Sequence, residues 1–496
     1  MASTFPNPLY SQHVLQHAYR DAQRYLFEPM LASHEAHALM LAGCGIISRE
    51  NAAAILDAVG QIRAAGVDAF AYQPGVEDLF FRIESQIIEI AGSDYGGNLQ
   101  LARSRNDLGH ALARIALREE ILTVYADLLG LRAAVLDQAR RHLRTLMPGY
   151  THTQPAQPVT FAHYLAGVLT FLAKDQARLA AAYANMNESP LGAAAFTGTG
   201  FPIDRERVAD LLGFDGVVVS THHAIGGGDY LTDLAFALQS LAIGLGRMTH
   251  DLLVRATKEA NALHIDDGFI QISSIMPQKR NPVVLEHLRA RLSRAAGYAQ
   301  TVTLQCHNIP YGDTQDIEDE ILPPLTQALD ASRESVELYT TFFETLELNE
   351  EHLRQEAGAG FTTATELADA LVREAGLPFR TAHHIVSGMV QDAVKAGVKS
   401  DELTLKMLQD SARRVLGGPV DFDAEQFARA LDPEHFVAVR RVLGGVAPDA
   451  TASVLDGQAA GLAKDQAWLT SARQRLDDAD QRRNAEATQF LNSENL

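Results

Sequence analysis

Residues 107–146 read DLGHALARIALREEILTVYADLLGLRAAVLDQARRHLRTL, and this proline-free stretch decides the fold class. Its apolar side chains recur at spacings of three and four, which predicts one long helix. Further stretches of the same character cover approximately residues 230–263, 282–305 and 324–348. Such helices exceed the usual globular length and indicate a bundle whose members also pack against other subunits.

The rest of the chain supports an all-α fold. No stretch shows the sustained alternation of a half-buried strand, and no strand–helix–strand rhythm is present. The length of 496 residues predicts more than one domain. We expect an N-terminal helical domain over residues 1–110, a central long-helix domain over 111–360, and a C-terminal helical domain over 361–496 that ends in a polar extension.

The composition excludes several classes of protein. The formal net charge is −20, from 42 Lys plus Arg against 62 Asp plus Glu, which argues against a nucleic-acid or anionic-membrane partner. Only two cysteines are present, so neither a disulfide framework nor a cysteine-based metal site is expected. The first residues, MASTFPNPLY, lack the basic and apolar regions of a signal peptide. We therefore expect a cytoplasmic protein.

Three segments are richer in polar side chains than their helical surroundings require. They are RSRND at 103–107, GYTHTQP at 149–155 and SSIMPQKRNP at 273–282. Each combines hydrogen-bond donors with nearby glycine or proline, as a loop that holds an anion would.

Each segment also has a plainer explanation. The polar residues Ser104, Arg105 and Asn106 precede a helix and could simply cap it, or they could clamp a carboxylate at its N-terminus. A single histidine such as His152 is more often structural than catalytic. The third segment contains two serines, a lysine, an asparagine and two prolines, and it precedes a helix that carries Glu286. This pattern favours a mobile lid that supplies a base and a cation.

These segments resemble the three signature regions of the fumarase/aspartase superfamily, most closely those of argininosuccinate lyase. The lid segment resembles the superfamily signature almost position for position. The resemblance to argininosuccinate lyase also covers ARSRND (102–107), PGYTHTQPAQPVTFAHYL (148–165), FPIDRERVADLLGF (201–214) and GFTTATELADALVREAGLPFRTAHHIV (360–386). It extends in the same order over roughly residues 30–450, so coincidence is excluded.

The resemblance implies a fold and a reaction. The protomer would have three α-helical domains, and the long central helices of four chains would form a twenty-helix bundle with active sites shared between subunits. The reaction would be a reversible β-elimination that cleaves an N-substituted L-aspartate, such as argininosuccinate, to fumarate and an amine. It would need no cofactor and no metal, and it would suit a role in arginine biosynthesis.

The resemblance also assigns residues to roles. Ser273 would be the general base, and Lys279 and Asn281 would hold the substrate carboxylate beside the reacting carbon. His152 would reach the site from another chain, oriented by Glu286. The other expected substrate contacts are Ser104, Arg105, Asn106, Thr151, Tyr311 and Gln315. A buried proton-transfer site of this kind stabilises the doubly negative intermediate with fixed donors and a lysine.

The sequence differs from argininosuccinate lyase at positions where the family contacts the amine half of its substrate. Met30 and His34 stand where the family has Asp and Ser, and Gln100-Leu101 replace His-Thr. Glu318 falls at the family's lysine, and Ile272 replaces a glycine before the serine pair. A different amine half, as in ethylenediamine-disuccinate lyases, is therefore a competing prediction. A catalytically silent tetramer is a second alternative, although retention of the reaction-centre residues favours activity.

Two other features do not point to a site. The histidine pairs His222-His223 and His383-His384 lack a carboxylate at a convincing spacing, so no metal site is expected. The glycine-rich stretch 197–200 follows no predicted strand and therefore does not indicate a nucleotide site.

Overall fold

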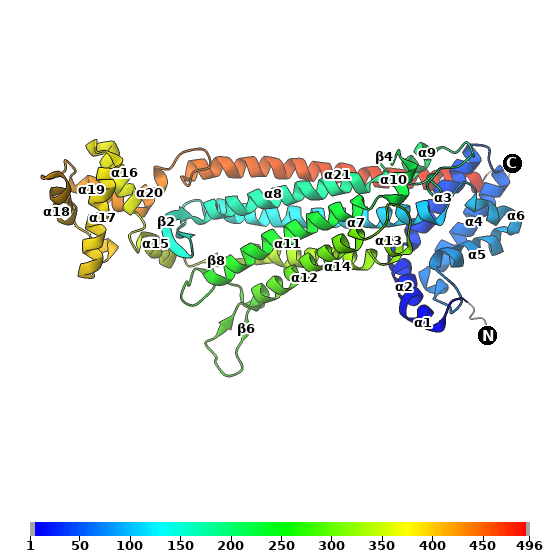
Figure 1. Cartoon of the computed structure of the whole chain (residues 1–496), viewed down its shortest axis with the longest axis horizontal. Coiled ribbons are helices and arrows are strands. Elements are labelled where there is room, and N and C mark those ends of the chain that lie inside the picture. Colours follow the sequence, from blue (N-terminus) through cyan, green and yellow to red (C-terminus); the bar gives the residue numbers. More distant parts are fainter. Residues whose placement is uncertain (1–4, 493–496) are drawn as a thin grey trace.

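The computed structural model describes residues 5–492, except for the side chain of Glu318. It is an elongated protomer in which long helices lie side by side in the middle, with N-terminal helices at one end and C-terminal helices at the other (Figure 1). The five long central helices are α7 (Arg105–Arg141), α8 (Phe161–Met186), α11 (Asp229–Arg255), α12 (Val283–His307) and α14 (Leu322–Thr345). The predicted all-α fold is confirmed.

Helix α7 is the axis of this arrangement. Its 37 residues begin after Ser104, whose backbone and side chain form a capping box with Asp107. Arg140 and Arg141 lie in its last turn, where cations interact favourably with the helix dipole. Buried side chains occur on all sides of α7, because α8, α14 and α21 pack around it. The helix ends five residues earlier than the sequence predicts, because the chain enters a strand at Leu146.

The central helices share one large core. It joins leucines, alanines and aromatic residues of all five helices, with α11 packed along α12 and α12 along α14. Short elements connect them: α9 (Arg205–Leu211), α10 (Thr221–Gly226), α13 (Gln315–Asp319) and α15 (Glu350–Gly358).

The strands are short and stand at the ends of the helices. They pair as β1 (Leu146–Thr151) with β2 (Gln154–Thr160), β3 (Glu188–Ser189) with β4 (Gly216–Val217), β5 (Leu263–His264) with β8 (Glu347–Leu348), and β6 (Gln271–Ile272) with β7 (Arg280–Asn281). Only β3 and β4 run parallel among these pairs. A 3-10 turn, η4 (Asp267–Phe269), precedes β6.

The N-terminal helices form a second core. It joins α3, α4 and α5 to the first turns of α7 and to α9. The elements of this end are α1 (Pro8–Tyr10), η1 (Ser11–Leu15), α2 (Gln16–Tyr25), α3 (Phe27–Gly43), α4 (Arg49–Ala65), η2 (Val67–Phe70), α5 (Leu79–Ala91), α6 (Ser93–Gly96) and η3 (Gly97–Gln100).

The helices at the opposite end have a third, separate core, built from α16 to α19. The elements are α16 (Ala364–Ala375), α17 (Phe379–Ala396), η5 (Ser400–Glu402), α18 (Leu405–Leu416), α19 (Ala424–Leu431) and α20 (Pro433–Ala438). The division of the chain at residues 110 and 360 remains a prediction.

The last helix, α21 (Pro448–Asn492), has 45 residues and runs back along the whole central bundle (Figure 1). It packs on α7 and α8 and reaches α3, α4 and α9. The sequence favours a solvated polar extension here, but Leu455, Leu469, Leu476 and Arg483 are buried. The apolar residues are sparse, yet these three leucines are buried against the rest of the protein, so a polar helix still contributes to the core.

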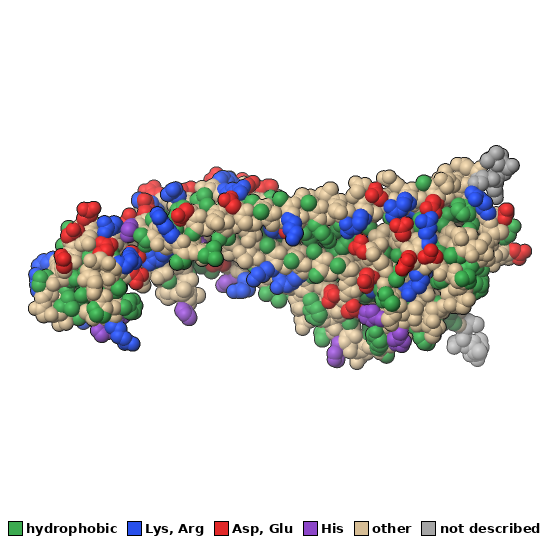
Figure 2. Space-filling view, turned by 90° about the horizontal axis from the view of Figure 1, so that it is seen from above, with side chains coloured by type: hydrophobic (Ala, Val, Ile, Leu, Met, Phe, Trp, Pro, Cys, Tyr) green, Lys and Arg blue, Asp and Glu red, His purple; other side chains and the backbone are tan. Residues whose placement is uncertain are grey.

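The surface carries both signs of charge. Figure 2 shows Lys and Arg side chains interspersed with Asp and Glu along the visible face, so the net charge is not gathered in one acidic patch on that face. None of the helices within residues 5–492 has the long uncharged apolar stretch that a bilayer crossing needs.

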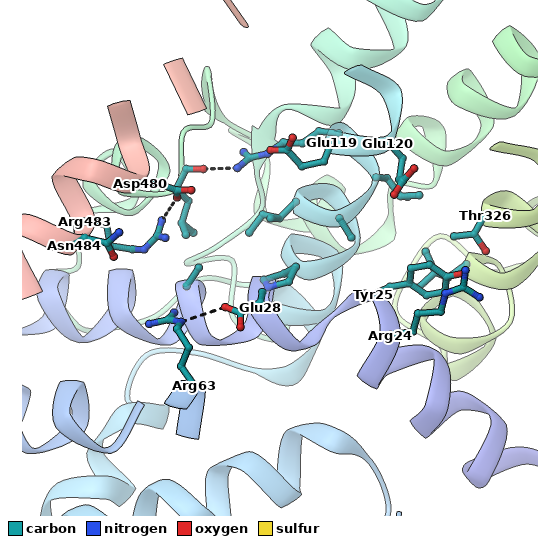
Figure 3. A pocket seen from close by; sticks show the side chains of 18 residues that line it. Arg24, Tyr25, Glu28, Arg63, Glu119, Glu120, Thr326, Asp480, Arg483 and Asn484 are labelled. Atoms are coloured by element: carbon teal, nitrogen blue, oxygen red, sulfur yellow. Dashed lines mark hydrogen bonds and ion pairs between the residues drawn. The ribbon is translucent and has the colours of Figure 1, made fainter. Parts of the chain in front are cut away.

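Ion pairs fix the end of α21 to the N-terminal helices. Arg483 lies at a cleft of about 510 Å³ between α3, α7, α14 and α21 (Figure 3). Its Nε lies 3.1 Å from Oε2 of Glu35, and its Nη1 donates to the carbonyl of Leu211 at 3.2 Å. Glu35 is also paired with Arg63 and is nearly inaccessible. The charges that line this cleft therefore hold helices together.

This contact predicts a large stability effect. Arg483→Leu should lower the free energy of unfolding by about 3 kcal/mol, because the buried Glu35 carboxylate loses one of its two cations. Urea unfolding followed by circular dichroism measures the change. Arg482→Leu is the matched control, since its pair with Asp210 is exposed and should contribute less than about 1 kcal/mol. Equal losses in the two variants would contradict this account of α21.

Candidate active site

The predicted lid is a loop between β6 and β7, just before α12. The two strands pair antiparallel, with Gln271 opposite Asn281 and Ile272 opposite Arg280. The Asn281 amide donates to the Gln271 carbonyl at 3.0 Å, which fastens the base of the loop. The loop stands clear of the bundle (Figure 1). A segment tied only at its base can move as a unit over a bound molecule.

Ser273 is placed so that its hydroxyl oxygen accepts backbone hydrogen bonds. The N–H of Met276 donates to Oγ at 3.1 Å, and the N–H of Ile275 lies 3.4 Å away. Lys279 N–H donates to the Met276 carbonyl at 3.0 Å and closes the turn. Two amide dipoles aimed at Oγ stabilise negative charge there, which is what a serine needs to act as a base.

A hollow of about 910 Å³ lies between this loop and the end of α11. Lys279, Asn281 and Glu286 are among its lining residues. The basic or histidine side chains that also line it are His250, Lys258, His264, Arg280 and Arg289. Because Glu286 is the only acidic side chain of this lining, the hollow attracts anions such as a dicarboxylate.

The hairpin of β1 and β2 presents His152 at its tip. Thr151 pairs with Gln154, so His152 and Thr153 form a two-residue turn. Both have positive φ, 50° and 62°, a conformation that favours Gly or Asn in such turns. Strain of about 1–3 kcal/mol per residue is typical of functional sites. Thr151 and His152 are both exposed, so the imidazole is available to another molecule.

The segment before α7 is engaged within its own chain. Ser104 is the N-cap of α7, so capping is confirmed as one role of this residue. The Arg105 guanidinium lies 2.6 Å from a carboxylate oxygen of Asp78 and 3.4 Å from one of Glu77. Ser104 Oγ lies 2.9 Å from the amide oxygen of Asn106. A carboxylate ligand of Arg105 would therefore compete with two acids.

Asp107 holds this segment against a second loop. Its Oδ1 accepts from the N–H of Ser104 at 2.9 Å, and its Oδ2 accepts from the N–H groups of Gly192 and Ala194 at 2.9 and 3.0 Å. Burial raises the pKa of Asp107 to about 6, against the lowering effect of these donors. Asp107 is not among the residues predicted from the sequence, although the Ser104-x-x-Asp107 spacing is that of a capping box.

The remaining predicted residues follow α12. The Tyr311 hydroxyl lies 2.8 Å from Nδ1 of His223, and Gln315 donates to Asp319 at 2.6 Å. The charge of Arg105 acts on Asp319, which places this segment near the start of α7. Tyr311 and Gln315 are exposed.

The predicted residues do not meet in one protomer. Helix α7 is about 55 Å long at 1.5 Å per residue, and it separates Ser104 at one end from the His152 hairpin at the other. The 25 residues of α12, about 37 Å, separate the lid from Tyr311 in the same way. Among the described residues, no contact joins His152 to Glu286. Within one chain, the residues predicted for a single site therefore lie in separate places.

Two departures in the sequence lie inside the protein. Met30 is 2% exposed and His34 is fully buried, with its Nδ1 3.1 Å from Nη1 of Arg103. Gln100 accepts from the same guanidinium at 3.1 Å. His34 and Gln100 thus share the Arg103 guanidinium, and the effect of Met30 and His34 on the amine half remains a prediction. The side chain of Glu318 lies outside the described residues.

Metal ligands are not grouped in this region. Across the described part of the chain, no three His, Cys, Asp or Glu side chains gather closely enough to hold an ion.

The Asp107 contacts predict that this residue stabilises the site. Asp107→Asn should lower the free energy of unfolding by about 2 kcal/mol, because an amide oxygen replaces one of two acceptors and its NH₂ faces a backbone N–H. Urea unfolding measures the loss. Asp57→Asn, an exposed change on α4, is the control and should leave the midpoint in place. An unaltered midpoint for Asp107→Asn would show that the loops hold without the carboxylate.

Known protein families and solved structures match most of the chain. The lyase family model matches residues 9–297, and the argininosuccinate lyase C-terminal model matches residues 361–438. An argininosuccinate lyase of Methanoculleus marisnigri is 37% identical over 95% of this chain and 94% of its own length. One of Natronomonas pharaonis is 40% identical over 94% and 90%. A solved EDDS lyase variant with bound fumarate superposes with a TM-score of 0.88, 34% identity and coverage of 97% and 96%.

Proposed function

Because this chain belongs to the argininosuccinate lyase family of carbon–nitrogen lyases, we propose that it cleaves an N-substituted L-aspartate, argininosuccinate or a close relative of it, to fumarate and an amine. The observation that carries the proposal is the Ser273 hydroxyl, which accepts two backbone N–H groups on the loop whose Lys279 and Asn281 line a basic hollow. This is the arrangement that a serine base and a carboxylate substrate require.

The residues suit a β-elimination. Ser273, as the alkoxide that its amide donors stabilise, takes the Cβ proton beside a carboxylate. The electron pair left on that carbon delocalises into the carboxylate, where Lys279 and the Asn281 amide stabilise the second negative charge. The pair then forms the carbon–carbon double bond as the C–N bond breaks. The leaving nitrogen takes a proton from His152, directly or through water.

Assembly of four chains would complete this site. Exposed Phe236, Ile243 and Val254 form one apolar stripe along α11, with exposed fractions of 51–56%. A groove of about 480 Å³ between α11 and α12 is lined by small residues such as Gly246 and Ala296. Both features suit packing against helices of another copy, and a bundle of twenty helices would bring together ends that α7 keeps apart.

A second candidate function is the same reaction on a substrate with a different amine half. The EDDS lyase structures, 33–34% identical to this chain, favour an enzyme that acts on a different amine half. The buried Met30 and His34 agree with a site that differs from the argininosuccinate pattern behind its substrate contacts. A silent structural tetramer is disfavoured, because Ser273, Lys279, Asn281, His152 and Glu286 are all retained in the sequence.

The serine assignment predicts the effect of a single change. Ser273→Ala should lower kcat by about a thousandfold or more, because no other group of the lid loop replaces the base. Loss of fumarate absorbance with a panel of amines measures the rate. Ser274→Ala is the matched control on the neighbouring exposed serine. Near-normal turnover in Ser273→Ala would disprove the assignment, and an inactive wild-type protein with every amine would disprove the proposed function.

Shared sites predict complementation between inactive chains. Ser273→Ala and Arg105→Ala should each be inactive alone. When the two chains are refolded together in equal amounts, about a quarter of the sites should combine an intact lid with an intact Arg105 segment, if these come from different subunits. Recovery of about a quarter of wild-type activity, with light scattering for mass, tests this. Mixed chains that remain inactive while forming tetramers would contradict the shared site.

A further inference from the structure

A second pocket, of about 280 Å³, lies beside the hairpin that carries His152. Its wall comes from β1, from the end of α11 with the loop that follows it, and from α15. Tyr150 and Thr153, which precede and follow the His152 turn, both line the pocket. It shares only His250 and Val254 with the lining of the hollow beside the lid. The pocket is therefore a separate space, and the proposed reaction makes no use of it.

Arg255 lines this pocket with a guanidinium whose hydrogen bonding is incomplete. The residue is 8% exposed, and its Cζ lies 5.7 Å from the ring centroid of Tyr150 and 4.9 Å from that of Tyr164. Its Nε donates to Asp251 at 3.2 Å, whereas its Nη1 contacts only the sulfur of Met147, a weak acceptor, at 3.7 Å. No hydrogen bond within the described part of the chain reaches Nη2. A buried donor of this kind requires an acceptor, which a ligand in the pocket can supply.

The same pocket carries negative charge. Glu259 and Glu356 line it, and neither forms an ion pair or a side-chain hydrogen bond with any residue that the structure describes. Asp251 lines it as well, but its charge is paired with Arg255. A simple carboxylate would approach the guanidinium against the repulsion of these acids, and a simple amine would leave Nη2 without an acceptor. A molecule that carries both a carboxylate and an ammonium group satisfies both parts of the wall.

The size and the apolar part of the wall narrow the choice further. Ligand pockets in proteins usually have volumes of about 300–1,000 Å³, so a space of about 280 Å³ suits a molecule no larger than an amino acid. Pro148, Ala262 and Leu353 also line it, and all three are buried. An aliphatic side chain gains from contact with these residues, whereas a charged side chain loses its hydration there.

We infer that this pocket binds an α-amino acid with an aliphatic side chain. The carboxylate of the amino acid accepts a hydrogen bond from Nη2 of Arg255, and its ammonium group faces Glu259 and Glu356. Because the guanidinium also contacts Met147 and Tyr150 of β1, the bound molecule braces the strand that leads to the His152 turn. The site is distinct from the proposed reaction, and binding alone tests it.

Isothermal titration calorimetry with L-leucine tests the site, and two analogues separate its two halves. Isocaproate has the same carbon skeleton without the ammonium group, and isoamylamine lacks the carboxylate. L-leucine should bind at least tenfold more tightly than either analogue, since each analogue loses a hydrogen bond between charged groups. Arg255→Met should weaken leucine binding by about tenfold or more, and it should leave isoamylamine binding nearly unchanged.

Substitution of the two acids tests the other half of the site. Glu259→Gln combined with Glu356→Gln should lower the affinity for leucine to that for isocaproate. Glu351→Gln is the matched control, because this exposed residue of α15 does not line the pocket. Circular dichroism checks that each variant is folded. If Arg255→Met does not fold, the acid variant and the two analogues decide the matter.

A titration in the presence of saturating fumarate distinguishes this pocket from the hollow beside the lid. The affinity for leucine should stay the same, because the two spaces are separate. Displacement of leucine by fumarate would overturn the inference. So would the absence of leucine binding, equal affinities for leucine and the two analogues, or an affinity for leucine that the substitutions of Arg255 and of the two acids leave unchanged.

Discussion

The rigidity of one long helix constrains everything else in this molecule. Because α7 is about 55 Å of continuous helix, the segment that precedes it and the hairpin that follows it cannot meet within one chain. The other long helices share its core and keep the lid and the Tyr311 segment at opposite ends of α12 in the same way. The proposed reaction, which needs these groups together, would have to draw them from several copies.

The residues proposed for the reaction lie on short segments at the ends of the long helices. His152 and Thr153 hold a left-handed turn that only a well-braced hairpin maintains, and the lid is fastened by one pair of two-residue strands and one side-chain amide. The backbone N–H groups at Ser273 give its oxygen the electrostatic support that a neutral serine lacks. The rigid helices thus position the loops at their ends, and these loops carry the polar and charged side chains.

The long helices were predictable because apolar residues recur along them at the helical period. The reaction class was predictable because the lid and the other two polar segments resemble a known signature. The two-stranded hairpin was not, since prolines and exposed polar residues hide its pairing. The packing of α21 was also missed: its few apolar residues lie far apart, and the partner of Arg483 is Glu35, at the other end of the sequence. The contacts of Asp107 and of His223 depend likewise on loops that only the folded chain brings together.

The return path of α21 has a consequence for synthesis on the ribosome. The N-terminal helices emerge first, but Glu35 receives the Arg483 guanidinium only when nearly the whole chain has been translated. Until then the surface that α21 covers on α7 and α8 is open to water and to other nascent chains. This flank is covered only once α21 has been translated, so a chain terminated before α21 would leave it exposed.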